Sequence, residues 1–366
     1  MAPLDNPAVP KGSTVLITGA NGLLGSHIAD QFLEYGYKVR GTVRDTEKNA
    51  WLQALFDKKY GKGNFELFKV ADLTAEGAFD EAVKGTSVVA HTATITSFAP
   101  DPNEVIPQAI AFAENALKSA YKETSVKRFV LTSSSSAAVL SVPGAPGIEV
   151  VEDTWNEVAV KAAWAEPPYT PERGGVVYAA SKTEAEKAVW KYHKENRNKR
   201  PDLVVNTVLP NFNFGKSLDP VNQGHPSSSG LPVALWQGQV TPFHHIIVPR
   251  MYLFFRLKSV IAKLFLEYFI NVQDTGRLHV AAAVFDHIKD RRIFGFAGRF
   301  NWDEILDILR KTAPNKEFPA NFSSGSDANE IKPRAEAEQL LRDLGQPGWV
   351  SLEETVLDNI SDVRDA

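Results

Sequence analysis

Tyr178 and Lys182 are the two residues of this 366-residue chain whose types and spacing most clearly suggest catalysis. Residues four apart share one face of a helix, and the surrounding sequence predicts a helix from about Val176 to Glu195. An ammonium group beside a phenol stabilises the phenolate, so we expect Tyr178 to act as a general acid or base near neutral pH. The pattern is short, and taken alone Tyr178 is as readily interpreted as a packing residue.

Four consecutive serines, Ser133–Ser136, follow the apolar run Arg128–Thr132, which predicts a buried strand. A hydroxyl at this strand end, placed beside Tyr178, would hold a carbonyl oxygen and stabilise the charge that develops on it. The serines, the tyrosine and the lysine would then form one polar group at the end of a strand.

Three glycines, Gly19, Gly22 and Gly25, follow the strand-like run 15–18 and open a predicted helix. A strand, a glycine-rich turn and a helix in this order are typical of dinucleotide binding. Gly19 would allow the sharp turn, Gly22 the approach of backbone amides to a pyrophosphate, and Gly25 close packing of helix on strand. The helix N-terminus favours phosphate there. Three glycines are a weak signal, since a purely structural turn is the alternative.

Basic residues at the second predicted strand, 38–44, indicate which dinucleotide binds. NAD-selective proteins carry an acidic residue here that holds the ribose 2′-hydroxyl. This strand offers Arg40 and Arg44 instead, with Lys48 just beyond. We therefore predict that the cofactor is NADPH/NADP+, whose 2′-phosphate suits such cations. Separately, Lys182 is expected to hydrogen-bond the nicotinamide ribose. A solvated basic strand end is the alternative interpretation.

Two further strand ends carry polar residues. Asp72 follows the predicted strand 65–70 and could meet an adenine amino group, or cap a following helix together with Thr74. The predicted strand 87–91 opens into small residues at Thr92–Thr94, which would let a cofactor lie close. His91, a lone histidine on this buried strand, is interpreted as structural.

Strands and helices alternate as far as residue 210, which predicts an α/β fold of the Rossmann type, with a doubly wound parallel sheet and a smaller C-terminal substrate lobe. Such sheets bind ligands beyond the carboxyl ends of their strands, where all these polar residues lie. We assign residues 1–210 to an NADP-binding domain. Residues 211–366 form mainly a substrate-binding lobe, with some segments returning to the first domain. The long segment 137–175 is expected to be functional.

Composition excludes several classes of protein. The chain has no cysteine, so disulfides, thiolate catalysis and cysteine metal sites are absent, which fits a reducing compartment. No metal site is expected. Net charge is −4 without a clustered basic face, so no nucleic-acid partner is expected. The polar N-terminus and the lack of a long uncharged run predict neither a signal peptide nor a transmembrane segment. We therefore expect a cytoplasmic protein.

Together these residues resemble a known family, the extended short-chain dehydrogenases/reductases of the NAD-dependent epimerase/dehydratase type. The similarity is to the dihydroflavonol reductase-like branch, which includes fungal aldehyde and carbonyl ketoreductases. It covers nearly the whole chain apart from one insert, and it rests on five stretches, 18–25, 37–44, 128–134, 178–186 and 209–211.

The resemblance implies a role for each matching residue. Ser134, the second serine after Thr132, would complete a catalytic triad with Tyr178 and Lys182. Cofactor contacts would come from Gly19, Gly22, Gly25, Arg44 (the 2′-phosphate), Asp72 and Leu73 (adenine), Thr92 and Thr94 (the ribose–phosphate region), and Pro210 to Asn213 (nicotinamide). A further phosphate contact near 227–229 aligns loosely.

The implied reaction is hydride transfer from NADPH to the aldehyde or ketone of a small molecule, such as one of secondary metabolism, with Tyr178 donating the proton. The partner is thus a small-molecule carbonyl substrate, and the protein a monomer or homodimer. Two other hypotheses remain open. One is epimerisation or dehydration of a sugar-like substrate with tightly held NAD. The other is a non-catalytic NADP-sensing regulator, although regulators typically lack the tyrosine–lysine pair.

Two stretches depart from the family pattern. The helix before the serine run carries Phe112-Ala113 where a Gly-Thr pair is usual, so its inner face is expected to be bulkier. An atypical insert, roughly 250–267, has apolar residues at helical spacing. It is interpreted as an amphipathic helix facing a partner or membrane, as a buried helix over the substrate pocket, or as a retained intron absent from the mature protein.

Overall fold

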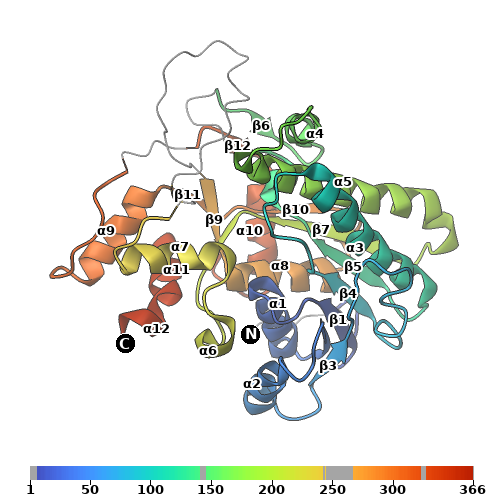
Figure 1. The fold of residues 1–366 in the computed structure, drawn as a ribbon. Coiled ribbons are helices and arrows are strands. Elements are labelled where there is room, and N and C mark those ends of the chain that lie inside the picture. The colour runs from blue at the N-terminus through green and yellow to red at the C-terminus, as the bar shows by residue number, and fades with distance from the viewer. Residues whose placement is uncertain (1–5, 141–145, 242–243, 245–266, 323–326, 366) are drawn as a thin grey trace.

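The computed structural model describes residues 6–140, 146–241, 244, 267–322 and 327–365. Seven parallel strands form one sheet in the order β10-β7-β5-β4-β1-β2-β3 (Figure 1). Their bounds are β1 Thr14–Thr18, β2 Lys38–Val43, β3 Phe65–Lys69, β4 Val88–His91, β5 Arg128–Thr132, β7 Val204–Pro210 and β10 Arg292–Gly295. The predicted Rossmann-type sheet is confirmed. The insert 250–267 lies outside the described residues up to residue 266, and all three interpretations of it stay open.

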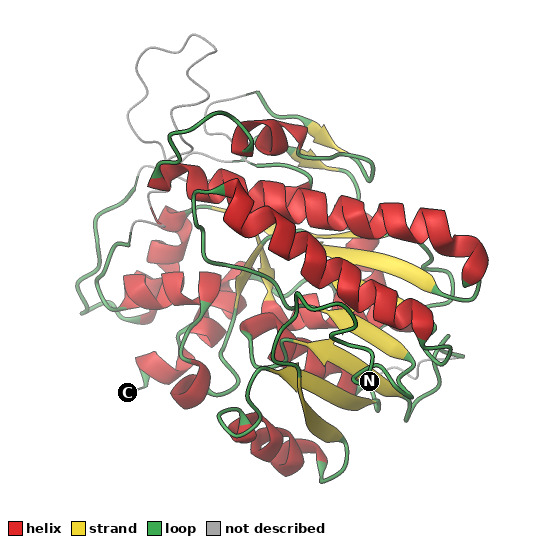
Figure 2. Ribbon diagram, turned by 45° about the vertical axis from the view of Figure 1, so that its right-hand side comes forward, coloured by secondary structure: helices red, strands yellow, loops and turns green. Residues whose placement is uncertain are grey.

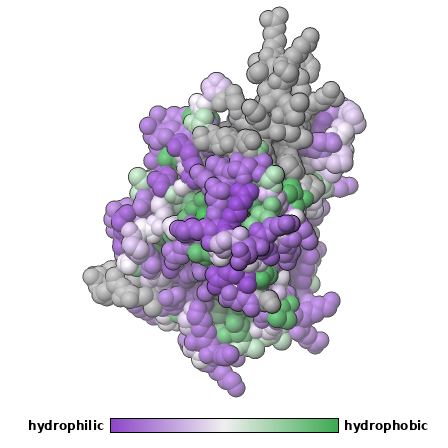
Figure 3. All heavy atoms as spheres, turned by 90° about the vertical axis from the view of Figure 1, so that its left-hand side faces the viewer, coloured by the Kyte–Doolittle hydropathy of each residue, from purple (hydrophilic) through white to green (hydrophobic). Residues whose placement is uncertain are grey.

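Helices cover both faces of this sheet. Figure 2 shows the long helices α3 and α5 crossing one face, and α1 and α8 pack together on the other. The helices are α1 Leu23–Glu34, α2 Ala50–Tyr60, α3 Pro102–Lys122, α4 Glu157–Ala163, α5 Gly174–Asn196, α6 Pro220–Gln223, α7 Gly230–Trp236, α8 Val272–Val284, α9 Trp302–Thr312, α10 Arg334–Asp343, α11 Leu352–Asn359 and α12 Ser361–Arg364. The face of the molecule that carries α9 is largely hydrophilic, with small scattered hydrophobic patches (Figure 3).

Two smaller sheets stand apart from the main one. β8 (Phe212–Phe214), β9 (Glu267–Asn271) and β11 (Gly298–Phe300) form a three-stranded sheet, and β6 (Glu149–Val150) pairs with β12 (Glu330–Ile331). β10 lies beyond residue 210 yet pairs with β7 in the main sheet. The boundary at residue 210 stays a prediction.

The alternation of strand side chains divides the core into two layers. In β1, Leu16 packs in the cluster beneath α3 and α5, whereas Val15 and Ile17 pack in the cluster beneath α1 and α8. Successive side chains of a strand point to opposite faces, so an apolar run without polar positions requires helices on both sides. Each fully buried side chain of this kind contributes about 2 kcal/mol.

Local hydrogen bonds explain two differences from the expected elements. The helical stretch predicted from the sequence over 46–59 begins only at Ala50, because the Asp45 carboxylate accepts hydrogen bonds from the backbone amides of Glu47 and Lys48 and holds a turn there. After Asp72 the chain makes turns over 76–85 rather than a helix. Asp72 accepts from the amide and hydroxyl of Thr74, which closes a local turn.

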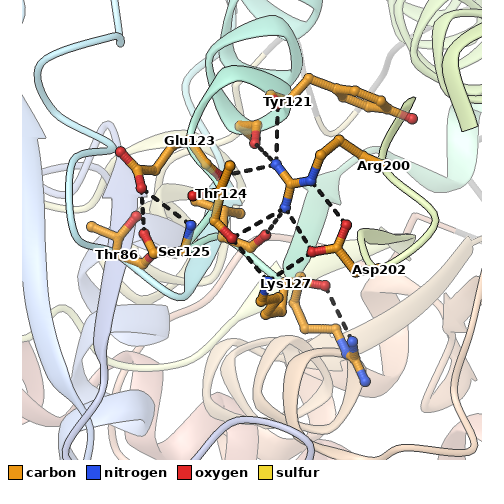
Figure 4. Close-up of polar contacts among 11 residues, drawn as sticks. Thr86, Tyr121, Glu123, Thr124, Ser125, Lys127, Arg200 and Asp202 are labelled. Atoms are coloured by element: carbon orange, nitrogen blue, oxygen red, sulfur yellow. Dashed lines mark hydrogen bonds and ion pairs between the residues drawn. The ribbon is translucent and has the colours of Figure 1, made fainter.

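A buried arginine holds the end of α3 and the start of β5. The Arg200 guanidinium donates to the carbonyl oxygens of Tyr121 and Glu123, at 3.1 and 3.0 Å, and pairs with Asp202 (Figure 4). It also donates to the Val126 carbonyl at 2.6 Å. The last carbonyls of a helix have no partner within it, and Arg200 supplies one. The loop that leads into β5, and so to the serine run, is thereby fixed.

Three buried histidines are neutral in the folded protein. Burial lowers the pKa of His27 to about 4, of His91 to about 3 and of His279 to about 4. The unfolded chain therefore binds more protons than the folded one between about pH 6.5 and pH 4. Their contribution to the free energy of unfolding is complete above pH 6.5 and is lost as the pH falls through this window.

We predict that His27→Gln flattens this acid limb. The His27 Nε2–H donates to the Lys216 carbonyl at 2.8 Å, and a glutamine amide can replace that bond without binding a proton. Urea unfolding at pH 7 and at pH 4.5 measures the slope. The wild type should lose more free energy than the variant by up to about 3 kcal/mol. Equal slopes in the two proteins would contradict this account.

Candidate active site

The carboxyl ends of the parallel strands meet at one edge of the sheet, and the polar residues predicted from the sequence stand there. Gly19 follows β1, Arg44 follows β2, and Thr92 follows β4. The serines Ser133–Ser136 follow β5, and Pro210 ends β7. Because the strands are parallel, these positions lie beyond the same edge of the sheet, which is where such folds bind ligands.

The glycine-rich turn has the geometry that a pyrophosphate requires. Gly19 has φ +66°, which favours glycine, and a Cβ on Gly25 would lie 2.2 Å from the Gly19 carbonyl oxygen. Gly25 is therefore required by the turn itself rather than by helix packing on the strand. Gly22 is the N-cap of α1 and provides no side-chain cap, so the amides of the first turn remain available to a phosphate. The turn fits a dinucleotide.

Gln223, which sequence reasoning missed, contacts the same turn. Its amide nitrogen donates to the Asn21 carbonyl at 3.1 Å and to the Ser26 hydroxyl at 3.0 Å. Ser217 donates to its amide oxygen at 3.0 Å. The short helix α6 is thereby tied to the glycine turn, although about two hundred residues separate them in sequence. No local pattern around Gln223 signals this contact.

The structure separates the two candidate arginines for the 2′-phosphate. Arg40 is wrong as a candidate: its guanidinium pairs with Glu66 at 2.5 Å and donates to the carbonyls of Ala82 and Lys84, both at 2.8 Å. These partners bind the Arg40 guanidinium beside the middle of β2. Arg44 is exposed just past the end of β2, and Lys48 is exposed beyond it. Arg44 therefore remains the candidate.

Asp72 and Leu73 lie in the loop after β3. Asp72 is exposed, and its bonds to Thr74 use one carboxylate oxygen, Oδ1. Leu73 is half-buried, and its carbonyl accepts from Asn115 on α3 at 3.1 Å. The local turn and the proposed adenine contact are compatible, because the Asp72 side chain stays exposed.

Thr92 belongs to a chain of hydrogen bonds beneath the site. The amides of Thr92 and Ala93 donate to the Thr18 hydroxyl at 2.9 and 3.0 Å, and the Thr18 hydroxyl bonds His91 Nδ1 at 2.9 Å. A 3.1 Å bond joins the hydroxyls of Thr92 and Thr132. His91 thus orients Thr18, in keeping with its structural interpretation. Thr94 is half-buried on the loop that follows.

Residues after β7 are held mainly by one another. Pro210 is buried. Asn213 donates to the Asn211 carbonyl at 2.8 Å and accepts from Thr275 at 2.6 Å. Ser228, in the loosely aligned stretch 227–229, donates to the Asn213 carbonyl at 2.8 Å. Asn213 therefore fixes this loop against α8, and the nicotinamide contact assigned to it stays a prediction.

The predicted triad comes together where α5 passes the end of β5. Ser134 Oγ accepts from the amide and hydroxyl of Ser136, at 3.2 and 2.9 Å, and Ser134 is the side chain that lowers the pKa of the Tyr178 phenol. Lys182 is buried, and its ammonium group donates to the Thr132 carbonyl at 3.4 Å. Among the four serines of the run, Ser134 is thus the one that acts on the acidity of Tyr178.

Burial dominates the acidity of both titrating groups. It raises the pKa of Tyr178 above its usual 10, while the hydrogen bond with Ser134 lowers it. Burial also lowers the pKa of Lys182 to about 8, while the negative charge of Glu186 raises it. The expectation that Lys182 depresses the Tyr178 pKa is therefore wrong for this structure, where burial raises that pKa and the opposing contribution comes from Ser134.

Phe98, also missed from the sequence, stands beside the phenol. Its ring centroid is 5.0 Å from that of Tyr178. A Cβ on Gly174 would lie 2.1 Å from the Phe98 carbonyl oxygen, so glycine at the start of α5 permits this close approach. On α3, Phe112 and Ala113 are both buried, as a bulkier inner face would require.

Comparison with known proteins places this geometry in a family. The sequence profile of the NAD dependent epimerase/dehydratase family matches residues 15–217, which is more than half of the chain. The chain belongs to this family. The predicted family resemblance is confirmed.

Two curated fungal relatives match almost end to end. Aldehyde reductase 2 of Sporidiobolus salmonicolor is 41% identical over 359 residues, with 98% of each chain covered. Ketoreductase adrE of Penicillium rubens is 36% identical over 363 residues, covering 96% of this chain and 97% of the relative.

Solved structures extend the fold to other members. The crystal structure of yeast methylglyoxal/isovaleraldehyde reductase Gre2 complexed with NADPH superposes with a TM-score of 0.76 at 24% identity, covering 96% of this chain and 98% of the other. UDP-glucose 4-epimerase of Bifidobacterium longum gives 0.65 at 15% identity, covering 96% and 98%. Both show the fold alone.

We predict that Arg44→Ala raises the KM for NADPH about 10- to 100-fold and leaves the KM for NADH unchanged, because a charge-assisted hydrogen bond to the 2′-phosphate is lost. Initial rates with each cofactor measure the ratio. Lys58→Ala, which removes an equal charge from the exposed side of α2, is the control. A parallel loss with both cofactors would contradict the role of Arg44.

We predict that Gln223→Ala raises the Kd for NADPH about fivefold and leaves kcat unchanged, because the Asn21 carbonyl and the Ser26 hydroxyl at the glycine turn lose their donor. Fluorescence titration with NADPH measures the Kd. Asn222→Ala is the matched control, since Asn222 bonds only to Asp219 among the side-chain partners in the described part of the chain. Equal affinity in the wild type and Gln223→Ala would refute the contact's importance.

Proposed function

We propose that this protein is an NADP(H)-dependent reductase that transfers hydride to the carbonyl group of a small-molecule aldehyde or ketone. The observation that carries the proposal is the meeting of Ser134, Tyr178 and Lys182 beside a glycine turn that fits a dinucleotide. The two fungal relatives, named aldehyde reductase and ketoreductase, support it. The position of Arg44 just past the end of β2 also agrees with NADP(H) as the cofactor.

The chain's residues divide the work of carbonyl reduction. NADPH, when bound, supplies the hydride. Ser134 donates a hydrogen bond to the substrate oxygen and places it beside the Tyr178 hydroxyl. As the carbonyl carbon gains the hydride, the C=O π bond breaks towards oxygen, and Tyr178 gives that oxygen its proton. The alcohol and NADP+ result. The buried Lys182 stabilises the phenolate that Tyr178 becomes and binds the nicotinamide ribose.

The remaining assignments follow from the same reaction. The 2′-phosphate lies at Arg44, the adenine at Asp72 and Leu73, and the pyrophosphate over the glycine turn. The lobe of residues 211–366 supplies most of the substrate contacts. Named ketoreductases among the fungal relatives point to a substrate of secondary metabolism. The chain acts in the cytoplasm, in keeping with its lack of cysteine, as a monomer or homodimer. No helix in the described ranges is long and apolar enough to cross a membrane.

We predict that Tyr178→Phe lowers kcat about a thousandfold while NADPH still binds, because the proton donor is lost and the ring is kept. NADPH oxidation with a panel of aldehydes, keto esters and aromatic ketones measures the rate, and fluorescence titration measures binding. Tyr192→Phe, about four turns further along the same helix and packed against Tyr121, is the control and should keep wild-type activity.

Two outcomes would overturn the proposal. Full activity of Tyr178→Phe would remove the assigned proton donor. Purification with bound NAD, together with no oxidation of NADPH on any carbonyl in the panel, would favour the epimerase or dehydratase hypothesis instead.

A further inference from the structure

Glu186, on α5 one turn beyond Lys182, is a fully buried carboxylate. Acidic side chains are rarely buried completely unless they are paired. Its Oε2 accepts from the Ser133 hydroxyl at 2.6 Å and from Arg292 at 3.3 Å. Its Oε1 accepts from Arg292 and Thr207, both at 2.8 Å, and from Trp190 at 3.2 Å. Both carboxylate oxygens are thereby used.

Apart from Trp190, which lies on α5 itself, these partners come from three neighbouring strands. Ser133 follows β5, Thr207 lies in β7, and Arg292 begins β10, and these strands are adjacent in the sheet. One carboxylate therefore joins the face of α5 that carries Tyr178 and Lys182 to half of the sheet. The position of that helix face relative to the strand ends depends on it.

The contact with Ser133 acts directly on the active site. Ser133 is held from both sides, because its amide donates to the Val208 carbonyl at 2.8 Å and its hydroxyl donates to Glu186. Ser134 is the next residue, so fixing Ser133 fixes the main chain that presents the Ser134 hydroxyl to Tyr178. The serine next to the catalytic one thus has a positioning task.

The charge of Glu186 acts on Lys182. The groups that act on this ammonium are the Thr132 carbonyl at the end of β5, the neutral His91 on β4, and Glu186 on its own helix, where Tyr178 lies one turn before Lys182. Among them Glu186 is the group that favours the protonated amine, against the effect of burial. The positively charged Arg292 of β10 pairs with Glu186 at 2.8 Å.

Arg292 carries the connection outward to the long loop before α5. Its guanidinium donates to the carbonyls of Glu152 and Thr154, at 2.6 and 2.7 Å, and stacks 3.8 Å from the Trp155 ring centroid. A buried ion pair is tolerated only when both members have their hydrogen bonds satisfied, and the pair formed by Glu186 and Arg292 meets this condition. The loop, the ion pair and Lys182 form one continuous set of contacts.

We propose that Glu186 is a positioning residue for the reduction, which fixes Ser133 and so Ser134, and which keeps Lys182 in its ammonium form. The inference rests on the proposed function, since it assigns Glu186 a task in the same reaction. Removing the charge while keeping the shape should therefore affect both the rate and its dependence on pH.

The test is the pH profile of kcat/KM for Glu186→Gln. Without the carboxylate, Lys182 loses its proton at lower pH and the proton donation by Tyr178 fails earlier. We expect kcat to fall about tenfold and the alkaline limb to move down by about one pH unit, with the Kd for NADPH unchanged. A merely structural role would lower the rate without moving the limb.

Matched variants separate the two tasks. Ser133→Ala keeps the charge and should lower kcat without moving the alkaline limb. Glu195→Gln removes an equal charge from an exposed position of the same helix and should change neither. If Glu186→Gln fails to fold, the double variant Glu186→Gln/Arg292→Gln, which removes both members of the buried ion pair and leaves no unpaired guanidinium, should show the same shifted limb.

Two results overturn the inference. One is a folded Glu186→Gln, or the folded double variant, with the wild-type alkaline limb. The other is failure of both variants to fold, as judged by circular dichroism, because Glu186 is then a structural residue first. Wild-type turnover in the same assay separates these results from failure of the proposed function, in which the wild type itself would reduce no carbonyl.

Discussion

A buried ammonium group is the constraint on which this site depends. Lys182 lies against the end of β5, where burial favours its neutral form and lowers its pKa to about 8. The ammonium is useful to the reaction only while it stays charged. The fold meets this requirement by placing Glu186 one helical turn away and by satisfying that carboxylate with Arg292 and two hydroxyls. The same ion pair connects α5, the main sheet and the loop before α5.

A second constraint is close approach of backbone to backbone. The glycine turn has no room for a Cβ at Gly25, and the start of α5 has none at Gly174. The first contact keeps the amides of α1 open to a phosphate. The second brings Phe98 against the ring of Tyr178. The glycine turn after β1 and the surroundings of Tyr178 are therefore both built on a close approach that only glycine permits.

Local patterns were enough to predict the sheet, because each strand is an apolar run followed by turn residues and each helix has its own period. They also predicted which strand ends carry polar residues. Contacts between distant residues could not be predicted in this way. Arg40 and Arg44 look equivalent in sequence, yet Arg40 forms an ion pair with Glu66 on the adjacent strand β3. Gln223 and Glu186 acquire their roles only when α6 meets the glycine turn and when β10 enters the sheet beside β7.

The most direct measurement of the central claim follows one hydrogen through the reaction. The protein is mixed with NADPH carrying deuterium at the transferring C4 position and with carbonyl substrates from the panel, and the products are analysed by mass spectrometry. The account predicts an alcohol with one deuterium on the former carbonyl carbon for each NADPH oxidised. Alcohol without deuterium, or no oxidation of NADPH while bound NAD stays unchanged, would contradict it.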